Sequence, residues 1–205
     1  MIAIIDYGMG NLQSVANILD YIGEASIITN KKEEIESADK LILPGVGAFG
    51  EAMENLKQLD LIDFLTKEVI GKKKPFLGIC LGMQLIAQKS YEMGEYAGLG
   101  WIKGEVKKLE AMGKEFRIPH IGWNDVIVQK ECVLYGKDLK PKVCYFVHSF
   151  HLDCTDKEDI TAVTNYGRNF VCSLERGNIM ATQFHPEKSQ KDGIEMMKKF
   201  VAYKN

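Results

Sequence analysis

The sequence predicts an α/β protein with an open, mostly parallel sheet, helices on both of its faces and added antiparallel strands. Three observations predict this class. Strand-like and helix-like segments alternate through the first half of the 205-residue chain. The strand-like segments there are short continuous apolar runs, the kind found in buried strands. The second half holds β-branched and aromatic segments separated by turn residues, which indicates antiparallel strands.

The first half opens with a βα unit. Residues 2–5 form an apolar run, and residues 11–22 repeat apolar side chains at a spacing near 3.6 until Gly23 ends the pattern. The run of lysines at 72–74 is expected to be a solvated turn before a strand. The further strands expected in this half are 25–29, 40–43 and 75–79, with helices at 50–70 and 81–89.

The second half supplies the antiparallel strands and a closing helix. A last strand leads into His185, and residues 193–203 have the spacing of an amphipathic helix. No repeat or linker divides the chain, so one domain over residues 1–205 is expected. The expected strands of this half are 126–128, 143–147, 160–163 and 179–184.

Composition and charge exclude several classes of protein. The chain is 46% hydrophobic and 26% charged, which is an ordinary globular composition. The net charge is −2 and the basic residues are scattered, so no nucleic-acid partner is expected. The start of the chain lacks the features of a signal peptide, and no apolar run approaches the roughly 20 residues that cross a bilayer. We therefore expect a cytoplasmic protein without membrane contact.

The cysteines are best considered one by one. They are five in number, an odd count, and form no C-x-x-C pair, which argues against a disulfide framework and a zinc knuckle. Four of them are expected to be small buried hydrophobic side chains, namely Cys132, Cys144, Cys154 and Cys172.

Cys80 stands apart because its surroundings have the form of a nucleophile elbow. An apolar strand runs through Gly78-x-Cys80-x-Gly82 into a helix. Such an elbow needs glycines on both sides, because the nucleophile sits in a strained turn against closely packed chain. The following helix N-terminus would favour a thiolate. Cys80 is therefore the candidate nucleophile.

A thiol nucleophile needs a base, and the base needs a group that orients it. His185 follows the last expected strand, and Glu187 follows it with one proline between them. Since the carboxyl ends of parallel strands converge on one edge of an open sheet, His185 and Cys80 are expected to meet there. The sequence thus predicts a catalytic set of Cys80, His185 and Glu187.

A glycine-rich turn at residues 43–50 follows another strand and offers backbone donors for an oxyanion. N–H groups near Gly47, with that of Leu81, could form the oxyanion hole. The same turn matches the glycine pattern of a dinucleotide site. That reading is disfavoured because the turn does not open the fold, Pro44 precedes it, and the acidic residue that such a site needs is missing.

No metal or cofactor is expected. His148 and His151 are three residues apart, but they lie in a segment that resembles a strand end or loop, without an acidic or cysteine cluster at ligand spacing.

Together these segments resemble a known family, the triad (class I) glutamine amidotransferases, and the likeness covers essentially the whole chain. Its three signatures correspond to residues 78–84, 44–47 and 183–189. More narrowly, the chain is similar to the glutaminase subunits of imidazole glycerol phosphate synthases. This closer likeness rests on residues 6–12, 119–124, 145–149 and 165–167.

The resemblance implies a class I amidotransferase fold in which Cys80 is the nucleophile, His185 the acid and base and Glu187 its orienter, with Val46 and Gly47 near the oxyanion. It implies a glutaminase that releases ammonia for a (β/α)8-barrel cyclase subunit of a heterodimer in histidine biosynthesis, with Trp123 near the contact. The glutamine contacts that it implies come from Gln84, Glu92, His148, Ser149 and Phe150.

Two positions leave an alternative open. Gln13 and Lys103 stand where the synthase subunits usually have a basic residue and a proline. A paralogue that supplies ammonia to a surface-sugar amidation enzyme would have the same glutaminase chemistry. A non-catalytic binding subunit is disfavoured by the complete catalytic set, and a cysteine protease of similar fold is disfavoured by Gln84 and by the Pro-Glu that follows His185.

Overall fold

The computed structural model describes residues 1–110, 113 and 116–204. Its main element is a nine-stranded sheet, in which five strands run parallel and four antiparallel strands extend one side. The predicted α/β class is confirmed. In order across the sheet the strands are β2 (Ser26–Thr29), β1 (Ile2–Ile5), β3 (Lys40–Gly45), β4 (Phe76–Cys80), β13 (Ile179–Thr182), β12 (Asn169–Arg176), β11 (Ile160–Asn165), β8 (His120–Val128) and β9 (Lys142–His148).

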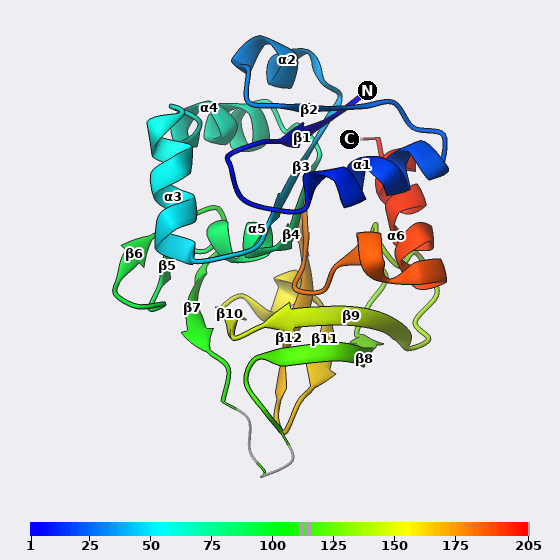
Figure 1. The fold of residues 1–205 in the computed structure, drawn as a ribbon. Coiled ribbons are helices and arrows are strands. Elements are labelled where there is room, and N and C mark those ends of the chain that lie inside the picture. Colours follow the sequence, from blue (N-terminus) through cyan, green and yellow to red (C-terminus); the bar gives the residue numbers. More distant parts are fainter. Residues whose placement is uncertain (111–112, 114–115, 205) are drawn as a thin grey trace.

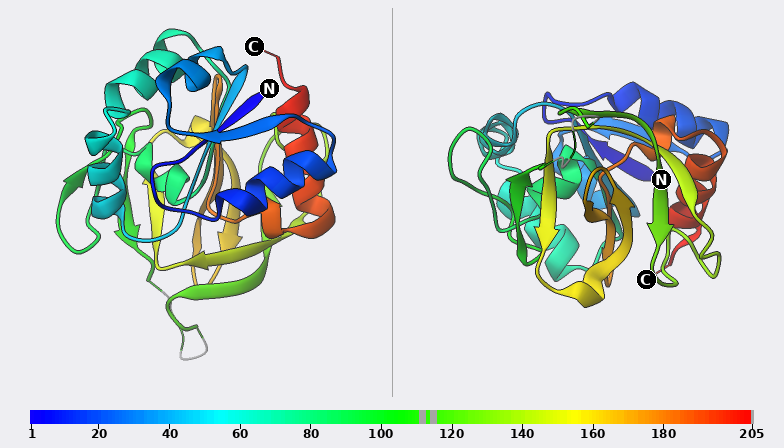
Figure 2. Two further views of the ribbon diagram at one scale, coloured as in Figure 1. Left: turned by 45° about the horizontal axis from the view of Figure 1, so that its top comes forward. Right: turned by 90° about the horizontal axis from the view of Figure 1, so that it is seen from below.

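Helices cover both faces of the parallel strands (Figure 1). On one face lie α1 (Leu12–Tyr21) and α6 (Gln190–Ala202), and on the other lie α2 (Lys32–Ser37), α3 (Phe49–Gln58) and α4 (Ile62–Thr66), as the turned views also show (Figure 2). Strand β1 is buried throughout: Ile2 and Ile4 join the core under α1 and α6, while Ala3 and Ile5 join the core under α2 and α3. Two-sided burial explains the continuous apolar run.

The single helix expected at 50–70 is three pieces. Helix α3 ends at Gln58, Asp60 takes the left-handed φ of 52°, and α4 then continues into a π-helical turn, η1 (Lys67–Gly71). A positive φ cannot continue a right-handed helix, so the helix ends there. The apolar periodicity of the sequence runs across this break and therefore does not reveal it.

The helix expected at 81–89 is also shorter, and α5 spans only Leu81–Leu85. The carbonyl groups of residues 85–87 accept hydrogen bonds from the N–H groups of residues 99–102 instead of from the next helical turn. The returning chain thereby starts a second sheet that the sequence did not predict. This sheet has the strand order β10 (Phe150–Cys154), β7 (Gly104–Lys108), β5 (Lys89–Ser90) and β6 (Tyr96–Ala97).

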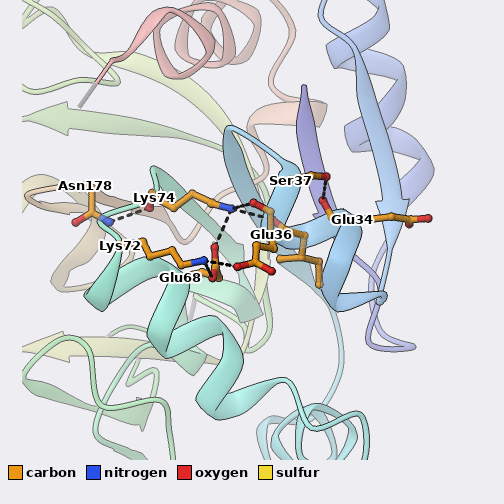
Figure 3. A network of polar contacts seen from close by, with 8 residues as sticks. Glu34, Glu36, Ser37, Glu68, Lys72, Lys74 and Asn178 are labelled. Atoms are coloured by element: carbon orange, nitrogen blue, oxygen red, sulfur yellow. Dashed lines mark hydrogen bonds and ion pairs between the residues drawn. The ribbon is translucent and has the colours of Figure 1, made fainter.

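The lysine run at 72–74 is not simply a solvated turn. Glu68 on η1 is fully buried, and its two carboxylate oxygens lie 2.7 Å from Lys72 Nζ and 2.9 Å from Lys74 Nζ (Figure 3). Lys74 also donates to the carbonyl oxygens of Ile35 and Glu36 on α2. The network ties α2 to η1 just before β4, at the end of that strand far from Cys80.

Two shorter turns complete the described elements, η2 (Lys157–Asp159) and η3 (Pro186–Lys188). Within residues 1–110, 113 and 116–204, none of the helices combines the length and apolarity needed to traverse a bilayer.

Candidate active site

Cys80 sits at the junction of β4 and α5 in a strained conformation, with φ 53° and ψ −105°. The two flanking glycines are required by close packing. A Cβ on Gly82 would lie 1.8 Å from the carbonyl oxygen of Leu43, and one on Gly78 would lie 2.7 Å from the carbonyl oxygen of Gly82. Holding the backbone of a non-glycine residue in this region of φ and ψ costs about 1–3 kcal/mol, and such strain gathers at functional sites. The sharp turn leaves the side chain at the carboxyl edge of the sheet.

His185 reaches the same edge from the neighbouring parallel strand, β13. Its backbone N–H donates to the carbonyl of Tyr145 on β9 at 2.9 Å, and its carbonyl accepts from the Ser189 hydroxyl at 2.6 Å. The Ser189 hydroxyl in turn accepts from the N–H of Tyr145 at 3.1 Å. These bonds clamp the turn after β13 against β9 and so fix the backbone of His185.

Glu187 orients the imidazole of His185. Its Oε1 lies 2.7 Å from Nδ1 of His185, and both side chains are almost fully buried. Burial lowers the pKa of His185, but ionised Cys80 and the Glu187 carboxylate outweigh burial and raise that pKa to about 10. His185 Nε2 has no hydrogen-bond partner among the described residues. The arrangement keeps the imidazole of His185 protonated beside the sulfur of Cys80, where it can donate its proton to a leaving group.

The glycine-rich turn lies beside the nucleophile, because Gly45 is the register partner of Cys80 in the β3–β4 pair. Val46 follows and is partly exposed, and Gly47 has φ 114°, a conformation that favours glycine. Leu81 begins α5 directly after Cys80. Val46 and Gly47 thus lie on one chain segment that flanks the sulfur, and Leu81 lies on the other.

Gln84, one turn into α5, links the nucleophile to the neighbouring strand. Its Nε2 donates to the carbonyl of Phe150 at 2.8 Å and to Oε1 of Gln183 at 3.1 Å. Nε2 of Gln183 lies 3.7 Å from Cys80 Sγ. Gln183 is fully buried. Gln183 is a site residue that the sequence did not predict, although it opens the 183–189 signature and precedes His185 by two positions.

The other residues expected to bind glutamine surround this core. The Val147 carbonyl is 3.8 Å from Cys80 Sγ, which places His148, Ser149 and Phe150 beside the sulfur. Glu92 lies on the loop between β5 and β6, where its Oε2 accepts from the N–H of Phe49 at 2.7 Å, at the start of α3. Glu92 is therefore held at the far end of the glycine-rich turn.

His148 and His151 fall in successive strands, β9 and β10, and both are buried. His148 is 3.0 Å from a second buried ring, that of His120 on β8. No local pattern predicts this pair, because 28 positions separate its members. Among the described residues, no group of three or more histidine, cysteine or acidic side chains is arranged to hold a metal ion.

Five free cysteines are buried, as expected for the four outside the elbow. Desolvation raises the pKa of each of those four thiols, to about 12 for Cys144 and about 11 for Cys154. They are therefore poor nucleophiles at neutral pH.

Trp123 lies on β8, on the outer face of the β8–β9 pair, and is 48% exposed. Its register partner is Tyr145, the residue that holds the backbone of His185. The exposed face that carries Trp123 is thus one strand away from the candidate site.

Comparison with known proteins gives close relatives over nearly the full length. The chain is 50% identical over 202 residues to "Imidazole glycerol phosphate synthase subunit HisH 1" of Campylobacter jejuni, which covers 98% of this chain and 99% of the relative. It is 47% identical over 203 residues to subunit HisH 2 of Vibrio vulnificus, covering 98% and 94%. A third relative, subunit HisH of Aquifex aeolicus, is 47% identical over 198 residues, covering 96% and 94%.

Solved structures share the fold at low sequence identity. A crystal structure of a glutamine amidotransferase superposes with a TM-score of 0.76 at 17% identity, covering 98% of each chain. PurLQS from Thermotoga maritima superposes with a TM-score of 0.74 at 16% identity, covering 98% of this chain and 97% of that one. The family model "Glutamine amidotransferase class-I" matches residues 3–203. The chain belongs to the class-I glutamine amidotransferase family.

Proposed function

We propose that this chain is the glutaminase subunit of an imidazole glycerol phosphate synthase, and that it releases ammonia from glutamine through a thioester on Cys80. The observation that carries the proposal is the catalytic geometry: a strained Cys80 beside His185, whose Nδ1 is 2.7 Å from Glu187. The relatives named as synthase subunits, at 47–50% identity over nearly whole chains, support the choice of acceptor enzyme over a surface-sugar amidation enzyme.

The first half of the proposed reaction forms the thioester. The ionised sulfur of Cys80 attacks the side-chain amide carbon of glutamine, and the carbonyl oxygen becomes an oxyanion. The imidazolium of His185 gives its Nε2 proton to the amide nitrogen, the carbon–nitrogen bond breaks, and ammonia leaves. The carboxylate of Glu187 stabilises the imidazolium before this transfer and holds Nε2 towards the reacting atoms.

The second half releases glutamate. Neutral His185 takes a proton from water as the water oxygen attacks the thioester carbon. The carbon–sulfur bond breaks, and the sulfur leaves as an anion beside the newly formed imidazolium. The site thereby returns to its starting charge state, with one glutamine and one water converted to glutamate and ammonia.

The residues around the sulfur have proposed roles in binding. Backbone N–H groups of the Val46–Gly47 turn and of Leu81 would donate to the oxyanion, because both segments flank the sulfur. Gln84, Glu92 and the 148–150 segment would hold the substrate. Gln84 fixes the Phe150 carbonyl, and the carboxylate of Glu92, held at the start of α3, would supply a negative partner for the amino group of glutamine.

The ammonia is proposed to pass to a (β/α)8-barrel cyclase subunit docked on the outer face of β8 and β9. Exposed apolar side chains gather on these two strands, and such a patch is typical of a protein contact. Those exposed by more than a third of their surface are Ile121, Trp123, Ile127 and Val143.

The test is an ammonia-release assay with the chain alone, with a cyclase barrel, and with that barrel plus its ribonucleotide ligand. We expect slow turnover alone and activation by the loaded barrel. The Val46–Gly47 turn adjoins Cys80, which is only 5% exposed, so a partner that biases the turn by about 1–3 kcal/mol would raise turnover about 5- to 150-fold. Full activity of the chain alone would refute the switch. Activation only by a sugar-amidating enzyme would reassign the acceptor.

A further inference from the structure

A buried pair of histidines lies behind the candidate site. His120 is the first residue of β8 and His148 the last of β9, and the two are register partners. Nδ1 of His120 lies 3.0 Å from Nε2 of His148. The His120 ring is stacked between Phe146, at a centroid distance of 4.7 Å, and Tyr166, at 4.1 Å. Neither histidine takes part in the proton transfers proposed above, and His120 lies outside the residues proposed to hold glutamine.

The hydrogen bonds of this pair fix the position of every proton. Nδ1 of His148 is 2.9 Å from the Phe150 carbonyl, which can only accept, so His148 carries its proton on Nδ1 and accepts at Nε2. His120 must then donate from Nδ1 and accept at Nε2. The Asn124 amide supplies that donor at 3.2 Å and gives its other proton to the Asn165 carbonyl at 2.9 Å. Burial lowers the pKa of His120 to about 4 and that of His148 to about 3, in keeping with two neutral rings.

The chain of bonds ends at the nucleophile. The Phe150 carbonyl that accepts from His148 also accepts from Gln84 Nε2 at 2.8 Å. Gln84 is bonded to Gln183, whose Nε2 lies 3.7 Å from Cys80 Sγ. In addition, the Val147 carbonyl next to His148 is 3.8 Å from the same sulfur.

We propose that His120 is a positioning residue for glutamine turnover, which holds His148 as the neutral Nδ1–H tautomer and so keeps the 147–150 segment in place against Cys80. The inference rests on the proposed role of Cys80 as nucleophile. The series of hydrogen bonds starts at Asn124, which is next in sequence to the exposed Trp123. A shift of β8 would therefore reach the substrate segment through three side chains, those of Asn124, His120 and His148.

His120→Phe is the informative variant. It keeps a flat ring between Phe146 and Tyr166 but removes both nitrogens, so Nε2 of His148 loses its donor. His120→Asn is the conservative variant, because its amide can donate from near the position of Nδ1. Tyr166→Phe is the matched control. It preserves the stack and removes only a hydroxyl, which donates to the Arg117 carbonyl at 2.8 Å, outside the chain of bonds.

The experiment compares two reagents for Cys80 on the full-length chain, with and without the cyclase barrel. Iodoacetamide is small and needs only an exposed, reactive sulfur, whereas 6-diazo-5-oxo-L-norleucine must first bind as glutamine does. For His120→Phe we expect labelling by the glutamine-shaped reagent to slow by about 10-fold or more, the effect expected when a buried acceptor, here Nε2 of His148, loses its donor. Alkylation by iodoacetamide should change by less than about 2-fold. His120→Asn should recover most of the rate, and Tyr166→Phe should match the original chain.

Three results separate the possibilities. If both reagents label His120→Phe as fast as the original chain, the inference about His120 is overturned and the proposed function stands. The same holds if the substitution slows labelling by both reagents equally. Absence of labelling at Cys80 in the original chain overturns the proposed function, and the inference with it. If His120→Phe does not fold, Asn124→Ala, at a half-buried position, should slow labelling by the glutamine-shaped reagent selectively.

In the original chain, long-range proton–nitrogen NMR should find both histidines protonated on Nδ1, and a proton on Nε2 of His148 would also overturn the inference.

Discussion

Oε1 of Glu187 lies 2.7 Å from Nδ1 of His185, and only Pro186 separates the two residues in the chain. The turn η3 makes this contact possible, because Pro186–Lys188 curls back so that the carboxylate faces the ring that precedes it. A local turn thus supplies two of the three groups of the candidate catalytic set. The third, Cys80, arrives from the adjacent strand β4.

His185→Ala is expected to lower kcat for glutamine by about 10² to 10⁴-fold, because the general acid and base is lost. Glu187→Gln should cost less, about 10- to 150-fold, since a hydrogen bond to a charged group contributes about 1.5–3 kcal/mol. Steady-state kinetics of the chain with its barrel partner measures both. If Glu187→Gln were as inactive as His185→Ala, Glu187 would have a more direct part in the chemistry.

The pH profile should also depend on Glu187. Burial alone would lower the pKa of His185, but ionised Cys80 and Glu187 raise it to about 10, so the imidazolium persists below that pH and is lost above it. Activity should therefore decline as pH rises through about 10. Glu187→Gln removes one of the negative charges that raise the pKa of His185, so the alkaline limb of the kcat/KM profile should move to lower pH. Glu54→Gln, an exposed change on α3, is the control and should leave the limb where it is.

A glutamine-shaped electrophile should label Cys80 and none of the other four cysteines. Those four are buried, and desolvation raises the pKa of their thiols. Peptide mass spectrometry after labelling reads the modified position directly. Modification mainly at Cys132, Cys144, Cys154 or Cys172 would remove Cys80 as the proposed nucleophile.

Trp123→Ala should weaken docking of the cyclase barrel by at least about 2 kcal/mol, as expected for an aromatic hot spot at the centre of an interface. Titration calorimetry measures this change. Tyr21→Ala is the control, because Tyr21 is more exposed than Trp123 but lies on α1, away from the β8–β9 face (Figure 1). An equal effect of the two substitutions would place the docking surface elsewhere.

Lys74→Met should lower the free energy of unfolding by about 1–3 kcal/mol, because it leaves buried acceptors without a donor. Lys74 forms an ion pair with buried Glu68 at 2.9 Å and donates hydrogen bonds to two carbonyl groups of α2. The exposed ion pair of Lys107 with Asp153, at 2.8 Å, offers a contrast, and Lys107→Met should cost about 0–1 kcal/mol. Chemical denaturation compares the two. Glutamine turnover should be unchanged in both, because neither lysine contacts the candidate site.

The sequence by itself determined the elements whose signal is local. The apolar runs that become β1, β3 and β4 are buried on both faces, so their composition identifies them without knowledge of their neighbours. The elbow around Cys80 is equally local in the sequence, because Gly78 and Gly82 stand on either side of the cysteine within one strand-turn-helix segment. His185 and Glu187 are two residues apart, so their contact also follows from the chain.

Only the tertiary structure decided the features that join distant segments. The helix expected at 81–89 gives way to a second sheet because residues 99–102 take its carbonyl groups. Within the lysine run at 72–74, Lys74 is drawn out of solvent because η1 buries Glu68, which pairs with Lys74 and with the more exposed Lys72. His120 and His148 meet because β8 and β9 pair in one register, which places two rings 3.0 Å apart that the sequence separates by 28 positions. Hydrogen-bond partners far apart in the chain leave no periodic trace in either segment, so such contacts become visible only when the strands are paired.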